Sequence, residues 1–157
     1  RSRVVTGVQT CALPILNLSP RIAFNENDVE LLARIMKAEA LGEGDEGMLM
    51  VGNVIVNRVV ANCDVFRDTR NISEVVYQKN AFSGVGQPLF NQPVNAKERE
   101  LALRNIDGYR VEPAYSALWF KNPGSNTACP DQFYGQLTGR YKNHCFYAPG
   151  GKLNCDL

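Results

Sequence analysis

The chain has 157 residues, and 45% of them are hydrophobic, which is enough apolar material for one core and one domain. Its formal net charge is +1 and its basic residues are scattered, so the clustered basic face of a nucleic-acid binder is excluded. No stretch reaches the roughly 18 uninterrupted apolar residues of a transmembrane helix. We therefore expect no nucleic-acid partner and no membrane span.

The start of the chain differs from the rest. Residues 5–15 look like the translation of a sequencing-library adapter, and we interpret residues 1–15 as an artefact of that kind. Residues 16–26 are then a leader or linker, and residues 27–157 form a single domain. A signal peptide is the alternative, because two arginines precede a mildly apolar stretch, but polar residues interrupt the apolar segment that a signal peptide needs.

The first predicted helix can be capped by Asn25 or Asn27 and extends to about Ala40. Glu39 lies at the edge of its apolar face, near the point where Gly42 ends the helix. A carboxylate held against apolar surface has a raised pKa, which suits a general acid at neutral pH. An ordinary, partly solvated helix-end glutamate is the alternative. The residues that define the apolar face recur at helical spacing: Val29, Leu32, Ala33, Ile35 and Met36.

An acidic turn over residues 42–47 leads into a second predicted helix, from about Glu46 to Ala61. This helix is apolar on most sides, which predicts a central position in the core. Asn57 and Arg58 interrupt that pattern. We interpret both as structural residues that bond to loops at the floor of a cleft.

Two more helices are predicted further along the chain. Ser73 is the expected cap of a short third helix that ends at Gln78, and a long loop rich in glycine and proline follows it. Asn95, with Glu98 three residues later, has the pattern of an N-cap pair. It predicts a fourth helix that extends to about Ile106.

Beyond a turn at Pro113 the pattern changes from helices to short strands. Strands are predicted at Ala117–Phe120, Phe133–Gln136 and Tyr141–Tyr147, with a turn at Thr138–Gly139. Helices first and a small antiparallel sheet toward the C-terminus predict an α+β fold.

The cysteines indicate an oxidising compartment. Without Cys11, which lies in the adapter-like segment, an even number remains, and we expect at least one disulfide bond that involves one of the last three. Buried unpaired cysteines are the alternative. No two are spaced C-x-x-C, so a zinc ribbon is not indicated. The four are Cys63, Cys129, Cys145 and Cys155.

The order and spacing of three blocks of sequence form one motif pattern. The first extends from Leu32 to Val59 and contains the run AEALGE; the second is Ile72–Ser83; the third combines Trp119–Pro123 with Asn143–Tyr147. Together they resemble the cell wall hydrolase family of spore-cortex-lytic enzymes, the SleB/CwlJ type. The family usually carries arginine where this chain has Leu41.

The resemblance implies a peptidoglycan-cleaving enzyme with a lysozyme-like fold, in which the cleft lies between the helical part and the sheet. It also implies one essential glutamate, which corresponds to Glu39. The expected partner is the glycan strand of peptidoglycan, and the expected location is extracytoplasmic: cell wall, spore cortex or coat, or secreted. We expect a monomer with no cofactor and no metal.

The number of catalytic carboxylates, one or two, decides which reaction the enzyme can carry out. Most glycosidases use a pair about 5 Å apart or about 6.5–9.5 Å apart. Glu43 lies four residues after Glu39, but Gly42 breaks the helical geometry that would bring the two together. We therefore favour a lytic transglycosylase, in which Glu39 alone protonates the glycosidic oxygen and then accepts the proton of the muramic-acid 6-hydroxyl. A muramidase that adds water is the alternative.

The remaining candidates are residue types that suit a saccharide cleft. Glu43 is placed among them, although it could instead accept hydrogen bonds from amides of the following turn. Trp119 is either a stacking platform or a core residue, with core favoured, and His144 has a binding or a structural role. The substrate-binding candidates are Glu43, Gln78, Phe82, Ser83, Trp119, Tyr134 and His144.

Three other functions are kept as alternatives. A zinc amidase typically needs more histidine than this chain has, because His144 is its single histidine. A stem-peptide hydrolase would use Cys63 or Cys129 as nucleophile with His144 as base. A wall-binding module without catalysis is the third, and it predicts that Glu39→Gln changes nothing.

Overall fold

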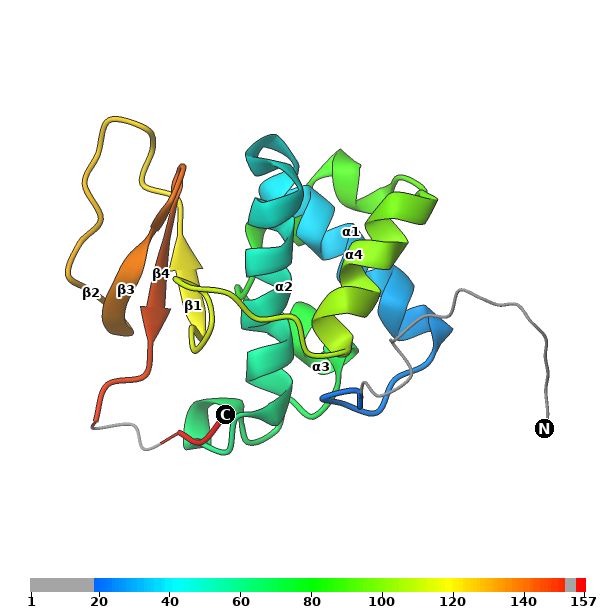
Figure 1. Cartoon of the computed structure of the whole chain (residues 1–157), viewed down its shortest axis with the longest axis horizontal. Coiled ribbons are helices and arrows are strands. Elements are labelled where there is room, and N and C mark those ends of the chain that lie inside the picture. Colours follow the sequence, from blue (N-terminus) through cyan, green and yellow to red (C-terminus); the bar gives the residue numbers. More distant parts are fainter. Residues whose placement is uncertain (1–18, 152–154) are drawn as a thin grey trace, which may run out of the picture.

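The computed structural model describes residues 19–151 and 155–157 (Figure 1). The interpretation of residues 1–15 as an artefact, Cys11 included, lies outside the described residues, as does the start of the segment 16–26. The described part of that segment packs on the helical body: Ile22 is buried, and the Arg21 N–H donates to the Ile106 carbonyl at 2.8 Å.

The first helix, α1 (Glu26–Ala40), begins where the sequence predicts. Asn25 is its N-cap, and Asp28 completes a capping box by accepting from the Asn25 N–H. The predicted acidic turn is shorter than expected. A 3₁₀ turn, η2 (Leu41–Glu43), joins α1 directly to α2 (Gly44–Val60), and Gly44 adopts a φ of 81° at the junction.

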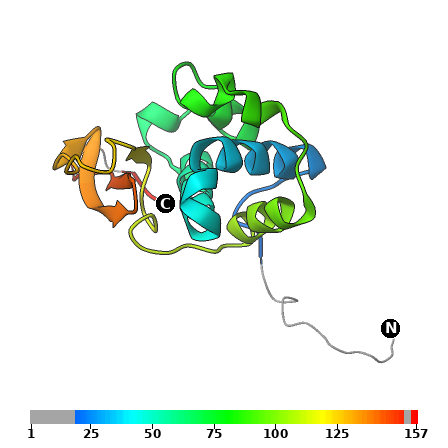
Figure 2. The same cartoon turned by 90° about the horizontal axis from the view of Figure 1, so that it is seen from above.

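Helix α2 occupies the centre of the molecule, as its all-round apolar surface predicts. One apolar cluster fills the space between α1, α2 and the other helices. Of two smaller clusters, one joins α2 to the sheet and the other joins the segment just after α2 to the sheet. Figures 1 and 2 show the helices gathered on one side of α2 and the sheet on the other. This arrangement confirms the predicted α+β class, with a helical N-terminal part and a C-terminal sheet.

The third helix, α3 (Ile72–Val76), is capped by Asn71, whose side chain accepts from the Glu74 N–H. The prediction of Ser73 as the cap was wrong, because the asparagine two residues earlier supplies the acceptor. The following loop contains the 3₁₀ turns η4 (Ser83–Gly86) and η5 (Pro88–Asn91); a further turn, η3 (Asp64–Phe66), precedes α3.

The fourth helix, α4 (Ala96–Ile106), has the predicted Asn95–Glu98 capping box. Glu98 also accepts from the Lys37 ammonium at 3.2 Å, and both side chains are buried. This ion pair joins α4 to α1. The predicted turn at Pro113 is present as well.

The sheet has four antiparallel strands in the order β1–β4–β3–β2. They are β1 (Trp119–Lys121), β2 (Gln132–Phe133), β3 (Gly135–Tyr141) and β4 (His144–Ala148). The predicted turn at Thr138–Gly139 was wrong. Those residues form a bulge inside β3, where the register shifts between Leu137 and Gly139, and the hairpin turn is Lys142–Asn143.

Of two disulfide bonds, one joins the C-terminus to the segment after α2 and the other lies within the sheet region. Cys63 is bonded to Cys155, and Cys129 is bonded to Cys145. The expectation of at least one bridge among the late cysteines is confirmed. None of the helices in the described part is long and apolar enough to cross a bilayer.

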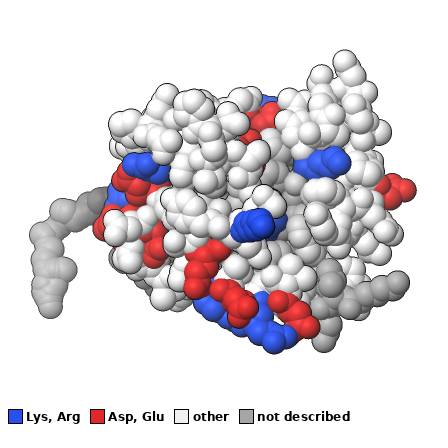
Figure 3. Space-filling model, turned by 180° about the vertical axis from the view of Figure 1, so that it is seen from behind, with Lys and Arg blue, Asp and Glu red and all other residues white. Residues whose placement is uncertain are grey.

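Charges of both signs are spread over the surface. The face seen in Figure 3 carries acidic and basic side chains next to one another and no broad patch of a single sign. This agrees with the near-neutral net charge.

Candidate active site

Glu39 lies in the last turn of α1, and its carboxyl group is held against η4. The Gly84 N–H and the Ser83 hydroxyl both donate to Oε2, the hydroxyl at 3.4 Å. Only glycine fits at position 84, because a Cβ there would overlap the carboxyl group and come within 2.9 Å of the Ala38 Cβ. Since both donors use Oε2, Oε1 has no donor among the described residues.

The surroundings of Glu39 raise the pKa of its carboxyl group. Desolvation by burial is the largest cause, and it outweighs the opposing effects of the Gly84 hydrogen bond, the nearby His144 and the Ser83 hydroxyl. The protonated form is therefore more populated than in a solvated glutamate. This direction agrees with the prediction from the apolar face of α1, and it is the state that a general acid needs.

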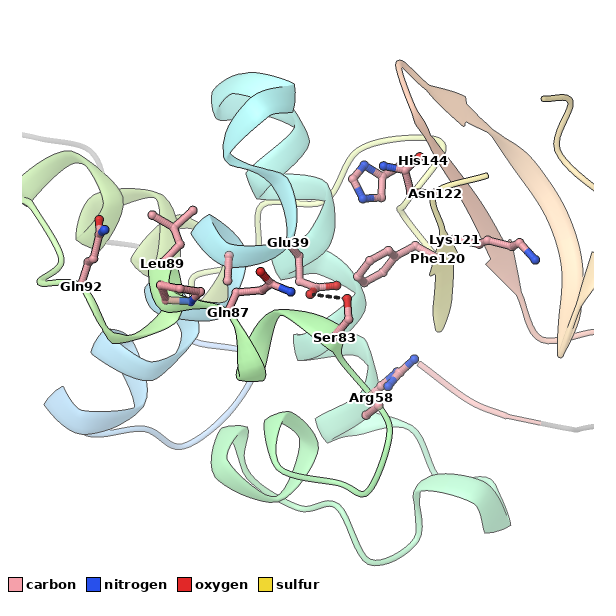
Figure 4. A pocket seen from close by; sticks show the side chains of 13 residues that line it. Glu39, Arg58, Ser83, Gln87, Leu89, Gln92, Phe120, Lys121, Asn122 and His144 are labelled. Atoms are coloured by element: carbon pink, nitrogen blue, oxygen red, sulfur yellow. Dashed lines mark hydrogen bonds between the residues drawn. The ribbon is translucent and has the colours of Figure 1, made fainter. Parts of the chain in front are cut away.

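Glu39 lines an open cavity of about 670 Å³ between the helical part and the sheet. Helix α1 and the η4–η5 segment form one wall, and β1 with the start of β4 forms the other. Figure 4 shows Glu39 beside Ser83, with Phe120 across from it and His144 above. The cleft therefore has the predicted position, with the acid on the helical side.

A second cavity of about 370 Å³ continues from the first, because Arg58, Ala81 and Phe120 line both. Gln78 and Trp119 line this second cavity, which ends at the sheet. We call the two cavities together the groove. Among the described residues that line the groove, Glu39 carries the single carboxylate.

Tyr134 forms an exposed aromatic platform at the far end of the groove. Its side chain is 76% exposed, and its ring stacks on Trp119 with centroids 6.1 Å apart. The backbone at Tyr134 has a φ of 62°, which is uncommon for a residue with a side chain. Gly135 follows, where the Ala148 carbonyl and the Trp119 ring leave no room for a Cβ. Trp119 itself is 6% exposed, so it is both a core residue and part of the groove wall.

Glu43 does not line the groove. It is buried, and its Oε1 accepts from the Asn143 N–H at 2.9 Å and lies 2.8 Å from His144 Nδ1. The Lys142 ammonium donates to the Glu43 carbonyl at 3.0 Å. Glu43 was expected among the substrate-binding residues, with the amides of the following turn as the alternative partners. The actual partners come from the β3–β4 hairpin, because η2 turns Glu43 toward the sheet.

His144 is held between this carboxylate and the aromatic side chains of the sheet. Its ring packs edge-on against Phe120, with centroids 5.3 Å apart, and it lines the groove near Glu39. Because Nδ1 is occupied by Glu43, Nε2 is the ring nitrogen available to a ligand. His144 thus has a structural contact and a groove-lining position at once.

Asn57 bonds to the loop before β1, as predicted for a structural residue. Its Nδ2 donates to the carbonyls of Ala117 and Tyr115 at 2.8 and 3.2 Å. Arg58 also donates to this loop, with its Nε 2.7 Å from the Leu118 carbonyl. Unlike Asn57, Arg58 lines both cavities of the groove, a position that its pattern in an apolar helix did not reveal.

The remaining candidates divide into groove and core. Ser83 and Gln78 line the groove. Phe82 is buried and stacks on Phe120, with centroids 5.9 Å apart, so it supports the groove from below. Leu41, which replaces the arginine usual in the resembled family, is 46% exposed and does not line either cavity.

Comparison with known proteins identifies the class. The family model for cell wall hydrolases matches residues 42–147, and the chain belongs to this family. The matched range begins three residues after Glu39. A cell wall hydrolase CwlJ of Oceanobacillus iheyensis is 51% identical over 130 residues, which cover 82% of this chain and 91% of the relative.

Other relatives agree. The cell wall hydrolase CwlJ of Bacillus subtilis is 47% identical, with 78% of this chain and 85% of the relative covered. A spore cortex-lytic enzyme of the same organism is 32% identical, and the match covers 67% of this chain and 32% of that longer protein. The catalytic domain of Bacillus cereus SleB has a TM-score of 0.63 and 25% identity, with 81% of this chain and 95% of the domain covered.

Proposed function

We propose that this cell wall hydrolase, of the spore cortex-lytic type and peptidoglycan-degrading, cleaves the glycan strand as a lytic transglycosylase. Glu39 is its single general acid and base, and the bond is the one between N-acetylmuramic acid and N-acetylglucosamine. The observation that carries the proposal is that Glu39, whose pKa burial raises, is the single carboxyl group among the described residues that line the groove. A structural relative is described as a germination-specific lytic transglycosylase.

The reaction has two proton transfers at one residue. Glu39 gives its proton to the glycosidic oxygen, and the bond from that oxygen to C1 of the muramic residue breaks. The Glu39 carboxylate then accepts the proton of the muramic 6-hydroxyl while O6 bonds to C1 and closes a 1,6-anhydro ring. Glu39 ends protonated, and no water is consumed, so no second carboxylate is required to activate one.

The hydrogen bonds at Glu39 suit this cycle. Oε2 accepts from Gly84 and Ser83, so Oε1 is the atom that carries the proton to the substrate. When Oε1 loses the proton, the same two donors and the neighbouring His144 stabilise the carboxylate. Burial therefore favours the protonated form of Glu39, while these donors and His144 favour the carboxylate that remains after the proton is given up.

The activities of the relatives and the residues that line the groove both indicate the substrate. Relatives are spore cortex-lytic enzymes and cell wall hydrolases, so we place the activity in cortex or wall peptidoglycan, outside the cytoplasm. Within the groove, Gln78 and the Trp119–Tyr134 stack offer an amide and aromatic faces to sugar rings. His144 Nε2 and Ser83 contribute polar contacts near Glu39.

The cysteine peptidase has no nucleophile in this structure, because Cys63 and Cys129 are both in disulfide bonds. A muramidase that adds water to the same bond is the remaining second candidate, since it would use the same acid. The product distinguishes the two, because the transglycosylase leaves a 1,6-anhydro end and the muramidase a reducing end.

The proposal is tested with Glu39→Gln, which keeps the shape of the side chain and removes the acid. Turbidity of a sacculus suspension reports cleavage, and co-sedimentation with sacculi reports binding. We expect binding to be retained and the clearance rate to fall by at least about a hundredfold, as is usual on loss of an essential general acid. A variant that clears sacculi at the wild-type rate would mean a binding module or a different catalytic group.

A further inference from the structure

Arg58 occupies an unusual position at the point where the two cavities of the groove meet. It is 6% exposed, and its guanidinium lies between the rings of Phe66 and Phe82, 5.1 and 4.9 Å from their centroids. Figure 4 shows its guanidinium end directed toward the space below Phe120. A buried cation of this kind normally has a carboxylate partner.

No described residue supplies that partner. Nε donates to the Leu118 carbonyl at 2.7 Å, and the Nη1 and Nη2 groups donate to no acceptor in the described ranges. In that part of the chain, Asn105 Oδ1 is the single unpartnered side-chain atom that is sealed from solvent. The unpartnered Nη groups of Arg58 are not sealed in this way, so they are open to the groove. Their planar arrangement matches a carboxylate.

Burial lowers the pKa of Arg58 to about 10, so the group remains charged at neutral pH while it bears the cost of desolvation. The other charged groups nearby do not relieve this cost. Lys79 and Lys121 also line the groove, against the single carboxyl group of Glu39, whose charged form burial disfavours. The groove away from Glu39 is thus positively charged.

We propose that Arg58 is a substrate-binding residue that recognises a carboxylate of the peptidoglycan strand. The inference rests on the proposed function, because it assumes that a glycan strand lies along the groove. A strand that extends from Glu39 to the Trp119–Tyr134 stack passes Arg58, and its muramic residues carry carboxylates on their peptides or, where the peptide is absent, on the lactyl group. A charge-assisted fork of two hydrogen bonds then holds the strand beside the acid.

The test compares soluble glycan strands in three forms. One form is native, one has all its carboxyl groups converted to methylamides with a carbodiimide, and one has been stripped of peptide by an amidase so that lactyl carboxylates alone remain. We expect capping to raise KM of the wild-type enzyme about tenfold or more, the usual loss for a charged hydrogen bond, with little change in kcat. Stripped strands, in which the amidase frees the lactyl carboxylate from its amide, locate the group: a KM near the native value shows that Arg58 accepts a lactyl carboxylate, and one near the capped value shows that it requires a peptide carboxylate.

Arg58→Gln should raise KM for native strands by the same factor. Capping the carboxyl groups should then cause no further rise in the KM of this variant. Arg70→Gln is the matched control, because Arg70 is exposed and outside the groove. Equal KM of the wild-type enzyme for native and capped strands would overturn the proposal, and this result needs no variant to fold. A full capping effect in folded Arg58→Gln would overturn it as well. Neither outcome touches the role of Glu39, which is measured by kcat and by the product.

Discussion

At the scale of single residues, the proposed chemistry depends on the environment of one carboxyl group. Glu39 is held by Gly84 and Ser83 through Oε2, and burial raises its pKa. A glutamate with a raised pKa is suited to act as acid first and base second. The surroundings, more than the residue type, raise the pKa of Glu39.

Because the folded state raises the pKa of Glu39, protonation favours folding. The stability from this effect is fully present below the unfolded value of about 4.5 and is lost as pH rises through the folded value. We therefore expect Glu39→Gln to raise Tm relative to wild type at pH 7, and the difference to shrink as pH falls toward 4. Thermal unfolding followed by circular dichroism at several pH values measures it. An equal Tm difference at all pH values would contradict the raised pKa.

Gly84→Ala tests how closely the carboxyl group is positioned. The added Cβ would overlap the Glu39 carboxyl group and displace it from its donors, so we expect kcat to fall about tenfold to a hundredfold, the scale of a small misplacement at a reacting centre. Gly86→Ala is the matched control in the same 3₁₀ turn, because its Cβ meets nothing within 4 Å. If both variants have the same kcat, Gly84 does not position Glu39.

At the scale of elements, the junction between α1 and the sheet fixes the width of the groove. Glu43 lies in η2, directly after the helix that carries Glu39, and it bonds to Asn143 and His144 of the β3–β4 hairpin. Gly47 makes room for it, since a Cβ there would collide with the Glu43 Cβ. The two walls of the groove are thereby tied together behind the acid.

Removing this tie should cost stability as well as activity. Glu43→Ala leaves the Asn143 N–H and His144 Nδ1 without their buried acceptor, and we expect the free energy of unfolding to fall by about 1–3 kcal/mol. Glu100→Ala, at an exposed position of α4, should have almost no effect. Urea denaturation measures both. A Glu43→Ala protein as stable as the control would show that the contact with the hairpin contributes nothing.

Elements with local signals could be predicted from the sequence, and those set by distant partners could not. The capping boxes at Asn25 and Asn95 are local, and both helices begin where expected. Glycine is typical of a turn, but pairing with β4 makes Gly139 part of a bulge, and the actual hairpin turn contains no glycine. A glycine fits a turn and a bulge equally well, and only the register between β3 and β4 decides between the two.

The site shows the same division. Glu39 could be identified from the helical spacing around it together with the family resemblance. The partner of Glu43 lies 100 residues further along the chain, beyond any local pattern. Arg58 was missed as a groove residue because an arginine inside an apolar helix is usually structural, and only the fold opens its Nη groups to a cavity.

At the scale of the whole molecule, one disulfide bond joins the C-terminus to the segment after α2, and a second joins the loop before β2 to β4 within the sheet region. Cys63–Cys155 spans 92 residues and Cys129–Cys145 spans 16. Loop-closure entropy predicts that each contributes about 3–5 kcal/mol, with the longer loop contributing more. The even set of cysteines noted in the sequence is therefore used entirely within this domain.

Replacing Cys63 and Cys155 by serine should lower Tm more than replacing Cys129 and Cys145, because the longer loop constrains the unfolded chain more. Calorimetry of the two double variants tests this order, with a thiol titration of the unreduced protein to confirm that the remaining pair is bonded. The reverse order would mean that local packing around Cys145, which is fully buried, outweighs the loop entropy.

The most direct test of the central claim is the product. Wild-type protein is incubated with sacculi in water labelled with oxygen-18, and the released muropeptides are analysed by mass spectrometry. A single Glu39 that serves as acid and then as base predicts 1,6-anhydro ends with no labelled oxygen. Reducing ends that carry the label would contradict it, because they require water to attack the bond that we assign to an internal hydroxyl.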